Sequence, residues 1–301
     1  MNIKRVVRGI KGRTVHLIAP VCTKISPMLN TCLLYRYLFG KKLDLDNPQT
    51  LNEKVLWLKF NDYWENPLVK QCADKYRVRD YIKKVGCQEI LNELICVYGS
   101  VDDIEWKKLP QSFAMKLNVG CGYNIIVPDK ARLDVKSAKN KLRKWMKEKY
   151  WLDYSEMQYK GVRQVIIVEK YLKPRNGVLP EDYKFYCFDG EAPYVMVCTD
   201  RQEGGKHPRY WYYNDKWEMQ MLSTDALKYG AEASVPKPEG IDDAFEYARK
   251  LSKGFPFVRV DLYLVDGKVY FGELTFTPSA GLDSGRLPAA DNLLGTYVKR
   301  P

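Results

Sequence analysis

The sequence predicts an α+β fold built from antiparallel hairpins with helices on one side. Several short runs alternate apolar and polar residues and are joined by turn-forming pairs such as Asp189-Gly190 and Asp266-Gly267. Two helical segments interrupt these runs, which favours a mixed α+β arrangement. With 301 residues, 46% of them apolar, the chain is long enough to bury a large core and to form two or three subdomains.

The first 43 residues form a basic segment with no acidic residue. Its positive charges are Lys4, Arg5, Arg8, Lys11, Arg13, Lys24, Arg36, Lys41 and Lys42. Apolar residues lie between them, so we favour an anionic membrane surface as partner, where each basic residue contributes about 1 kcal/mol. A basic arm without a partner and a mitochondrial presequence are the alternatives. Nucleic acid is not expected, because no helix-turn-helix, RNP or Cys/His-finger pattern accompanies the charge.

Residues 44–110 are expected to form a small helical region. A turn beginning at Asn47 leads into the cap signal Thr50-Leu51-Asn52-Glu53, and residues 54–60 then resemble a short helix. A longer helix is expected over residues 68–85, ended by Gly86.

Strand signals dominate from residue 111 onward. We expect one subdomain over residues 111–172 and a second over residues 173–301. The predicted strands cover residues 112–117, 123–127, 164–172, 183–188, 194–199 and 209–213, followed by a hairpin over residues 258–278. The two predicted helices cover residues 135–150 and 241–253.

Cysteine usage indicates a reducing compartment. The eight cysteines are scattered singly, with no Cys-x-x-Cys pair, and there are two histidines, His16 and His207. This pattern favours free thiols in the cytosol and argues against structural zinc. No apolar run approaches the roughly 20 residues that a membrane-spanning helix needs.

The most informative segment is the C-terminal hairpin. From Val258 to Leu264 apolar residues alternate with Arg259, Asp261 and Tyr263, so one face of the strand is apolar and the other carries charge. The second strand adds Glu273. Carboxylates placed against a packed sheet need a cation, so these groups indicate a site that holds a cation and an anion together. An ordinary Arg259–Glu273 ion pair is the alternative.

The register of this hairpin decides whether the two carboxylates share a face. A two-residue Asp266-Gly267 turn would place Asp261 opposite Gly272 and turn Glu273 to the other face. An odd-length connection, with a bulge at Gly267, would bring both carboxylates to one face. We predict the bulged hairpin.

Two further segments carry candidate ligand groups. Lys116 ends an apolar strand and precedes a loop containing Gly120 and Gly122, whose backbone N–H groups are able to cover phosphates. A plain hairpin turn is the alternative. Glu169-Lys170-Tyr171-Leu172 ends another apolar strand, and Asp182-Tyr183-Lys184 opens the next. Here solvent-exposed charge at a strand end is the alternative.

Taken in order, these motifs resemble the TupA-like branch of the ATP-grasp superfamily. The resemblance runs from about Leu45 to about Gly295. It rests on Thr50-Leu51-Asn52-Glu53-Lys54, Ala73-Asp74-Lys75-Tyr76, Asp182-Tyr183-Lys184-Phe185, Phe257-Val258-Arg259-Val260-Asp261 and Glu273-Leu274-Thr275-Phe276-Thr277-Pro278. This branch is associated with teichuronopeptide and other bacterial surface-polysaccharide synthesis.

The resemblance implies an ATP-grasp fold in which two antiparallel sheets clasp ATP. It implies that adenine lies along the backbone of Glu169, Lys170, Tyr171 and Leu172 and that Asp182 lies near the ribose. Lys116 and Lys184 would bind the phosphates, and Gly120 and Gly122 would form the lid over them. The implied ligands of Mg²⁺ are Asp261, Glu273 and Thr275. Arg259 would stabilise the charge on an acyl-phosphate and on the tetrahedral adduct that follows.

Two positions depart from the family pattern. Thr275 stands where many ATP-grasp enzymes have an asparagine, and a hydroxyl is a poorer magnesium ligand than an amide carbonyl, which implies a weak second metal. The lid sequence Val119-Gly120-Cys121-Gly122 replaces a His-Gly-Ser-Gly-like loop. The glycines needed for close approach remain, while lid contact with the terminal phosphate is altered.

The resemblance implies a carboxylate–amine ligase of surface-polysaccharide synthesis, for example one that joins an amino acid to a uronic acid, in the cytoplasm or at the inner face of the membrane. Basic and aromatic residues are candidates for contact with an acidic sugar: Arg201, Lys206, His207, Arg209, Tyr210 and Trp211. One alternative is a nucleotide-binding pseudoenzyme that acts as a scaffold at the membrane. Another is a glycosyltransferase. Such enzymes often hold a metal through an Asp-x-Asp motif at a strand end, whereas Asp44-Leu45-Asp46 lies in a predicted loop.

Overall fold

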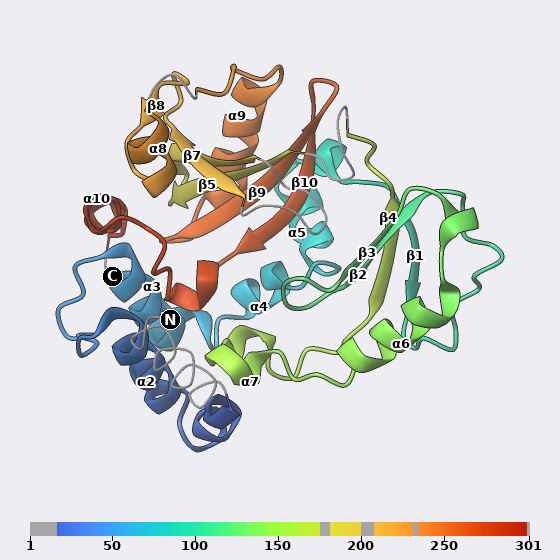
Figure 1. The fold of residues 1–301 in the computed structure, drawn as a ribbon, viewed down its shortest axis with the longest axis horizontal. Helices are drawn as coiled ribbons and strands as arrows, with labels where there is room; N and C mark the ends of the chain where they lie inside the picture. Colours follow the sequence, from blue (N-terminus) through green and yellow to red (C-terminus); the bar gives the residue numbers. More distant parts are fainter. Residues whose placement is uncertain (1–16, 175–180, 200–207, 231–233, 300–301) are drawn as a thin grey trace, which may run out of the picture.

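Two antiparallel sheets form the framework of the molecule (Figure 1). The computed structural model describes residues 17–174, 181–199, 208–230 and 234–299. The smaller sheet has the strand order β1-β4-β2-β3 and the larger has the order β10-β9-β5-β6-β7-β8. The strands are β1 (Leu94–Tyr98), β2 (Phe113–Leu117), β3 (Asn124–Val127), β4 (Ile166–Lys170), β5 (Asp182–Phe188), β6 (Glu191–Thr199), β7 (Arg209–Tyr213), β8 (Met219–Gln220), β9 (Val258–Val265) and β10 (Lys268–Thr275). The predicted α+β class is confirmed.

Helices surround the sheets. Besides the helical residues 17–25, they are α2 (Pro27–Phe39), α3 (Leu51–Leu58), α4 (Pro67–Ala73), α5 (Val78–Lys84), α6 (Val135–Trp145), α7 (Trp151–Tyr154), α8 (Thr224–Tyr229), α9 (Ile241–Ser252) and α10 (Pro288–Tyr297). Short 3₁₀ or π turns are η1 (Lys59–Tyr63), η2 (Gln88–Ile90), η3 (Lys130–Arg132), η4 (Met157–Tyr159) and η6 (Pro278–Gly281). No helix of the described ranges is both long and apolar enough to cross a membrane.

Each sheet packs its own helix and has its own core. On the smaller sheet, Leu142 of α6 packs with Phe113 and Met115 of β2. On the larger sheet, Phe245 of α9 meets Phe185 of β5 edge to face, with 4.9 Å between ring centroids. Each sheet therefore forms its core with its own helix rather than against the other sheet.

Strand β1 is an element that the sequence did not predict. Its residues, Leu-Ile-Cys-Val-Tyr, form a short apolar run without alternation, and each is only partly buried. Periodicity cannot separate such a run from a helix or loop segment. Since β1 pairs with β4, the smaller sheet takes in residues from both sides of the boundary expected at residue 110.

The helix predicted over residues 68–85 is wrong in one respect, because the segment is two helices, α4 and α5. Asp74 ends α4 with an extended backbone, at ψ 114°. Its Oδ1 accepts the N–H of Tyr76 at 2.8 Å, and such local bonds compete with the helix. The break places Lys75 on a turn between the two helices.

The second half of the basic segment is folded onto the body of the protein. Ser26 caps α2 by accepting the N–H of Leu29, and Pro27 begins the helix. On the inner side, Leu34 and Tyr35 are buried, and the Tyr35 hydroxyl donates to Glu53 at 2.7 Å. Residues 1–16 of the segment lie outside the described residues.

A buried polar network fixes these N-terminal helices further. Thr23 donates to the carbonyl oxygen of Leu152 at 2.6 Å. Asn30 Nδ2 donates to Thr23 Oγ1 at 2.8 Å and to Ser155 Oγ at 3.1 Å. Because these groups are buried and paired with one another, the rotation of the helices about their axes is determined.

The turn of the C-terminal hairpin differs from the prediction. Val265 pairs directly with Lys268, so the Asp266-Gly267 connection has two residues, with φ values of 50° and 73°. Two positive φ angles are typical of a type I′ turn. The bulge predicted at Gly267 is therefore wrong.

The register shift lies farther along β10, between Phe271 and Glu273. Gly272 is the extra residue of this bulge. Beyond it, Glu273 pairs with Asp261 and Thr275 with Arg259. The predicted common face for the two carboxylates is thus confirmed, although the bulge that creates it is in a different place.

Candidate active site

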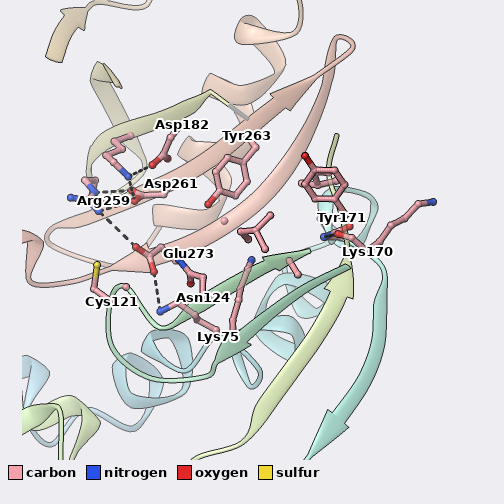
Figure 2. Close-up of a pocket in the computed structure, with 18 residues that line it drawn as sticks. Lys75, Cys121, Asn124, Lys170, Tyr171, Asp182, Arg259, Asp261, Tyr263 and Glu273 are labelled. Carbon is pink, nitrogen blue, oxygen red and sulfur yellow. Dashed lines mark hydrogen bonds and ion pairs between the residues drawn. The ribbon is translucent and has the colours of Figure 1, made fainter. Parts of the chain in front are cut away.

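A cavity of about 300 Å³ lies between the two sheets. The smaller sheet contributes apolar side chains from β2 and β3, Ala114 and Ile126, while Tyr263 comes from β9 of the larger sheet. Figure 2 shows that the charged groups of β5, β9 and β10 gather at one end of the cavity and that Lys170 and Tyr171 lie at the other. Carboxylates and cations of the larger sheet are therefore concentrated at one end of the cavity (Figure 2).

Asp261 is buried and is held by two cations. Arg259 binds it through two hydrogen bonds, from Nε to Oδ1 and from Nη2 to Oδ2, both at 2.7 Å. Lys184 Nζ donates to Oδ2 at 2.7 Å and also pairs with Asp182. Burial alone would lower the pKa of Arg259 and of Lys184, but the Asp261 carboxylate raises both above their ordinary values. Both side chains are therefore protonated.

Glu273 lies beside Asp261 and faces the cavity (Figure 2). Lys75 Nζ is 3.1 Å from its Oε2, and Arg259 Nη2 is 3.9 Å from its Oε1. Burial would raise the pKa of Glu273, but Lys75, Lys184 and Arg259 lower it to about 2. Glu273 is therefore a carboxylate at any physiological pH.

Thr275 connects Arg259 to Glu273. Arg259 Nη2 donates to Thr275 Oγ1 at 3.3 Å, and Thr275 Oγ1 donates to Glu273 Oε1 at 3.3 Å. The hydroxyl thus orients the guanidinium and the carboxylate relative to each other.

Lys116 reaches the same cavity from the smaller sheet. Its Nζ donates to Glu169 Oε2 at 2.8 Å, and Arg79 Nη1 lies 3.4 Å from the other oxygen of that carboxylate. In this structure Glu169 is the anion that a half-buried strand lysine requires. The side chain of Glu169 therefore holds Lys116 at the cavity wall.

The glycine-rich loop runs between β2 and β3. Gly120 and Gly122 have φ values of 76° and 80°, a conformation that side chains disfavour. A Cβ atom on Gly120 would also lie 2.6 Å from the Tyr150 ring. Lys75 Nζ donates to the carbonyl oxygen of Gly120 at 2.5 Å, so Lys75 ties this loop to Glu273 of the other sheet.

Residues 169–172, which are predicted to lie along adenine and are called the hinge below, begin in β4 and continue past its end. Tyr171 and Leu172 line the cavity. The N–H of Lys170 donates to Glu93 O at 3.0 Å, and its carbonyl oxygen accepts from Asn92 Nδ2 at 2.8 Å. Both backbone groups of Lys170 thus already take part in bonds that fix the position of the hinge.

A second cavity, of about 450 Å³, adjoins the first. Three residues line both cavities: Cys121, Arg259 and Glu273. The walls of the second cavity include three tyrosines, a carboxylate and a leucine of α2: Tyr150, Tyr154, Tyr159, Glu156 and Leu38. A ligand in the second cavity would therefore lie next to a ligand in the first cavity, with Arg259 within reach of both.

A strained turn forms part of this second cavity. Ser279 and Ala280 have φ values of 50° and 59° and precede Gly281 at 77°. A left-handed conformation of a non-glycine residue costs about 1–3 kcal/mol. The fully buried Lys59 holds the turn by donating to Ala280 O at 3.4 Å and to Tyr154 O at 2.6 Å.

Glu156 is a buried acid at the wall of the second cavity. Thr277 Oγ1 donates to its Oε1 at 2.6 Å. Burial raises the pKa of Glu156 above its ordinary value, although Lys59 and the Thr277 hydrogen bond act against this shift. Burial likewise lowers the pKa of Lys59 to about 8, with Glu156 acting against that shift.

The donor groups on the hairpin fit a magnesium ion that is shared with phosphates. In the described part of the chain, no group of three or more His, Cys, Asp or Glu side chains has a metal-binding arrangement. Mg²⁺ in nucleotide sites usually takes one or two carboxylates and completes its shell with phosphates and water. Glu273 is ionised and partly exposed, whereas Asp261 already accepts three hydrogen bonds, two from Arg259 and one from Lys184.

Most of the predicted site residues gather around the first cavity. Those that line it are Lys116, Gly122, Lys170, Tyr171, Leu172, Asp182, Lys184, Arg259, Asp261 and Glu273. Gly120 and Thr275 line the second cavity. Glu169 lines neither of the two cavities, and its carboxylate pairs with Lys116 and Arg79 instead. Arg209, Tyr210 and Trp211 lie on β7 and line neither cavity as described, and Arg201, Lys206 and His207 fall outside the described residues.

Among the residues that line the first cavity and that sequence reasoning missed are Lys75, Asn92, Asn124 and Tyr263, whose side chains are polar. Lys75 belongs to a motif that carries the family resemblance, and this motif is the one feature of the sequence that points to a functional role for it. Tyr263 alternates with Arg259 and Asp261 on β9 and so shares their face. Asn92 and Asn124 have no distinguishing pattern in the sequence.

Comparison with protein families decides the classification. The family model for the TupA-like ATP-grasp proteins matches residues 53–299. The chain belongs to the TupA-like ATP-grasp family. No curated protein matches this family member.

Solved structures similar to this TupA-like chain include several ligases. D-alanine–D-alanine ligase from Bacillus anthracis complexed with ATP is 15% identical, with a TM-score of 0.42, and the match covers 76% of this chain and 65% of that protein. L-amino acid ligase from Bacillus licheniformis is 13% identical, with a TM-score of 0.46, and the match covers 77% of this chain and 50% of that protein. The TupA-like chain thus matches between half and two thirds of these proteins.

Proposed function

We propose that this protein is an ATP-dependent carboxylate–amine ligase. The observation that carries the proposal is the convergence of Arg259, Asp261 and Glu273 with Lys184 in a cavity between two antiparallel sheets. Membership of the TupA-like ATP-grasp family supports ATP as the nucleotide.

In this proposal ATP occupies the first cavity. Adenine lies at the end formed by Tyr171 and Leu172, against the apolar side chains of the smaller sheet, and the ribose lies near Asp182. The phosphates meet Lys116 from one sheet and Lys184 from the other, which neutralise their charge. The glycine-rich loop covers the phosphates with backbone N–H groups, because Gly120 and Gly122 have the left-handed conformation that such loops use.

Glu273 and Asp261 would hold Mg²⁺, with Thr275 close to Glu273. When bound, the ion neutralises phosphate charge and polarises the transferred phosphoryl group. Phosphate oxygens would compete with Asp261 for Lys184 and Arg259, since both cations are protonated and reach the cavity.

The proposed reaction has two steps. A carboxylate oxygen of the substrate attacks the γ-phosphorus of ATP, the bond to the β-phosphate oxygen breaks, and ADP leaves. The amine nitrogen then attacks the carbonyl carbon of the acyl-phosphate, inorganic phosphate leaves, and the amine gives up a proton to solvent. Arg259 is placed to stabilise the negative oxygens of both steps, because its guanidinium lines both cavities.

The second cavity is the proposed place for the other substrates. Its tyrosine walls suit the apolar faces of a sugar ring, and Glu156 offers a carboxylate to an amine. These features support, as the finer proposal, an amino acid joined to a uronic acid during the synthesis of a surface polysaccharide, such as a capsule or a teichuronopeptide-like polymer. We place the reaction in the cytoplasm, where ATP is available.

The test compares Asp261→Asn and Glu273→Gln with the surface control Glu65→Gln. ADP release would be measured with Mg²⁺-ATP across a panel of amino acids and uronic-acid glycans. We expect at least about a 100-fold loss in the two site variants and no loss in the control. Circular dichroism would confirm that all three are folded.

Two outcomes would contradict the proposal. Full turnover in both site variants would refute the metal assignment. A wild-type protein that is stabilised by ATP analogues but releases no ADP with any substrate of the panel would support a nucleotide-binding scaffold instead of an enzyme.

A further inference from the structure

The N-terminal helices carry an unusual number of exposed apolar side chains. Fourteen large hydrophobic side chains are exposed in the described part of the chain. Seven of them lie within residues 17–33: Leu17, Ile18, Val21, Ile25, Met28, Leu29 and Leu33. Single exposed apolar residues are ordinary, but a concentration of this kind marks an interaction surface.

Helical spacing aligns these residues. Leu17, Val21 and Ile25 are four residues apart and therefore share one face of the first helix. Leu29 and Leu33 repeat the spacing on α2. Five of the seven residues thus repeat at the spacing of one helix face, three on the first helix and two on α2. We call the seven exposed residues together the apolar strip.

The strip cannot turn inward. Thr23 and Asn30 are buried and hydrogen-bonded on the inner side, and Tyr35 is buried with its hydroxyl on Glu53. Rotating the helices would break these bonds and leave the buried groups unpaired, which costs about 1–3 kcal/mol for each group.

The charged side chains within residues 17–42 are all basic. Lys24, Arg36 and Lys42 are exposed, and so is Lys41, which also pairs with Glu53 at 2.8 Å; the first acidic residue of the whole chain is Asp44. A symmetric dimer through this face would bring the same positive charges together, because each copy offers the same patch to the other. An anionic surface is the complementary partner.

We propose that residues 17–42 form a docking surface for an anionic lipid bilayer. The apolar strip would enter the boundary between headgroups and acyl chains, while the basic side chains would contact lipid phosphates. The surface is already formed and oriented on the folded protein, which lowers the entropy that binding must overcome.

Docking would also bring the second cavity close to the bilayer. Leu38 of α2 lines that cavity, and a helix is only about 10–12 Å across. A substrate carried at the membrane surface would then be within reach of Arg259. This consequence rests on the proposed ligase function, whereas the docking surface itself does not.

The experiment measures the binding of the full-length protein to vesicles of phosphatidylcholine with and without phosphatidylglycerol. The test variant is Val21→Gln/Ile25→Gln/Leu29→Gln, and the matched control changes three exposed apolar residues elsewhere, Met221→Gln/Leu227→Gln/Leu293→Gln. We expect the test variant to bind anionic vesicles more than about tenfold more weakly, and the control to bind like the wild type. Lys24→Gln and Arg36→Gln should each weaken binding about fivefold.

Three results would overturn the proposal. The first is equal vesicle binding by the test variant and the wild type, and the second is equal binding to vesicles with and without phosphatidylglycerol. The third is that neither protein binds vesicles, while sedimentation shows a dimer for the wild type and a monomer for the test variant. Stabilisation by ATP analogues would be measured on the same samples. If it were absent, the proposed function would fail while the vesicle result stood.

Discussion

At Gly272 the two strands of the C-terminal hairpin approach so closely that no side chain fits. A Cβ atom there would lie 2.8 Å from the carbonyl oxygen of Asp261 and 3.1 Å from the Tyr263 ring. The first contact is with backbone, which cannot move aside alone. The bulge that turns Glu273 to the face of Asp261 therefore requires glycine.

We predict that Gly272→Ala destabilises the protein by about 1–3 kcal/mol, because the added methyl group forces β9 and β10 apart. It should also weaken Mg²⁺-dependent nucleotide binding, since Asp261 and Glu273 move relative to each other. Denaturant unfolding and titration with an ATP analogue would measure the two effects. Gly99→Ala is the matched control, because the nearest neighbour of its Cβ is the flexible end of Arg163 at 3.4 Å. An unchanged free energy of unfolding for Gly272→Ala would contradict the prediction.

At the level of elements, the sequence predicts most of the hairpin but places the bulge wrongly. The alternation of apolar side chains along β10 marks the correct place of the bulge, because the alternation shifts by one residue at Gly272. Apolar side chains stand at odd positions before it and at even positions after it: Val269 and Phe271, then Leu274 and Phe276. A parity change on one strand requires an extra residue, and the glycine marks where that residue lies.

Other elements depend on contacts that no local pattern contains. Asp74 breaks a helix because its side chain accepts backbone N–H groups, and β1 becomes a strand because β4 offers it an edge. Within the site, the Lys75–Glu273 ion pair joins the turn between α4 and α5 to β10. The second cavity depends on a fold in which α2, α7 and η6 meet, so spacing along the chain does not predict it.

The junction of α2 and α3 has a pH dependence that can be tested at Glu53. Its carboxylate accepts from Tyr35 at 2.7 Å, Lys41 at 2.8 Å and the N–H groups of Gln49 and Thr50 at 3.0 and 3.2 Å. Burial raises the pKa of Glu53, but these hydrogen bonds together lower it to about 2. A carboxyl group with a lowered folded-state pKa contributes stability above its unfolded pKa, near 4.5, and this contribution is lost as the pH falls toward 2.

We therefore predict that Glu53→Gln destabilises the protein by about 2–4 kcal/mol at pH 7 and that the difference from the wild type shrinks as the pH falls below about 4.5. Chemical denaturation between pH 7 and pH 3 would measure it. Glu65→Gln, at an exposed ion pair with Lys70, should show little difference at any pH. A Glu53→Gln penalty that is constant with pH would contradict the assignment.

On the scale of the whole molecule, the two proposed phosphate-binding lysines come from different sheets. Lys116 is on β2 of the smaller sheet and Lys184 on β5 of the larger one, and both line the same cavity. A nucleotide held by both would join the two sheets.

We predict that Lys116→Met and Lys184→Met each weaken ATP about 10- to 100-fold and weaken adenosine much less, because only ATP presents the charges that the lysines neutralise. Calorimetric titration of both ligands would measure the ratio. Lys108→Met, at an exposed lysine outside the cavity, is the control. An equal loss for both ligands would mean that the variants are misfolded rather than specifically impaired.

The wall shared by the two cavities makes their ligands thermodynamically interdependent. Cys121, Arg259 and Glu273 line both spaces, so a ligand that repositions any of these groups in one cavity changes what the other cavity offers. Thermodynamic linkage then requires a reciprocal effect. If bound nucleotide changes the affinity for the second ligand by some factor, the bound second ligand changes the affinity for nucleotide by the same factor. Filling one cavity would therefore raise or lower the affinity of the other cavity for its ligand, and the two would work as one cooperative binding unit.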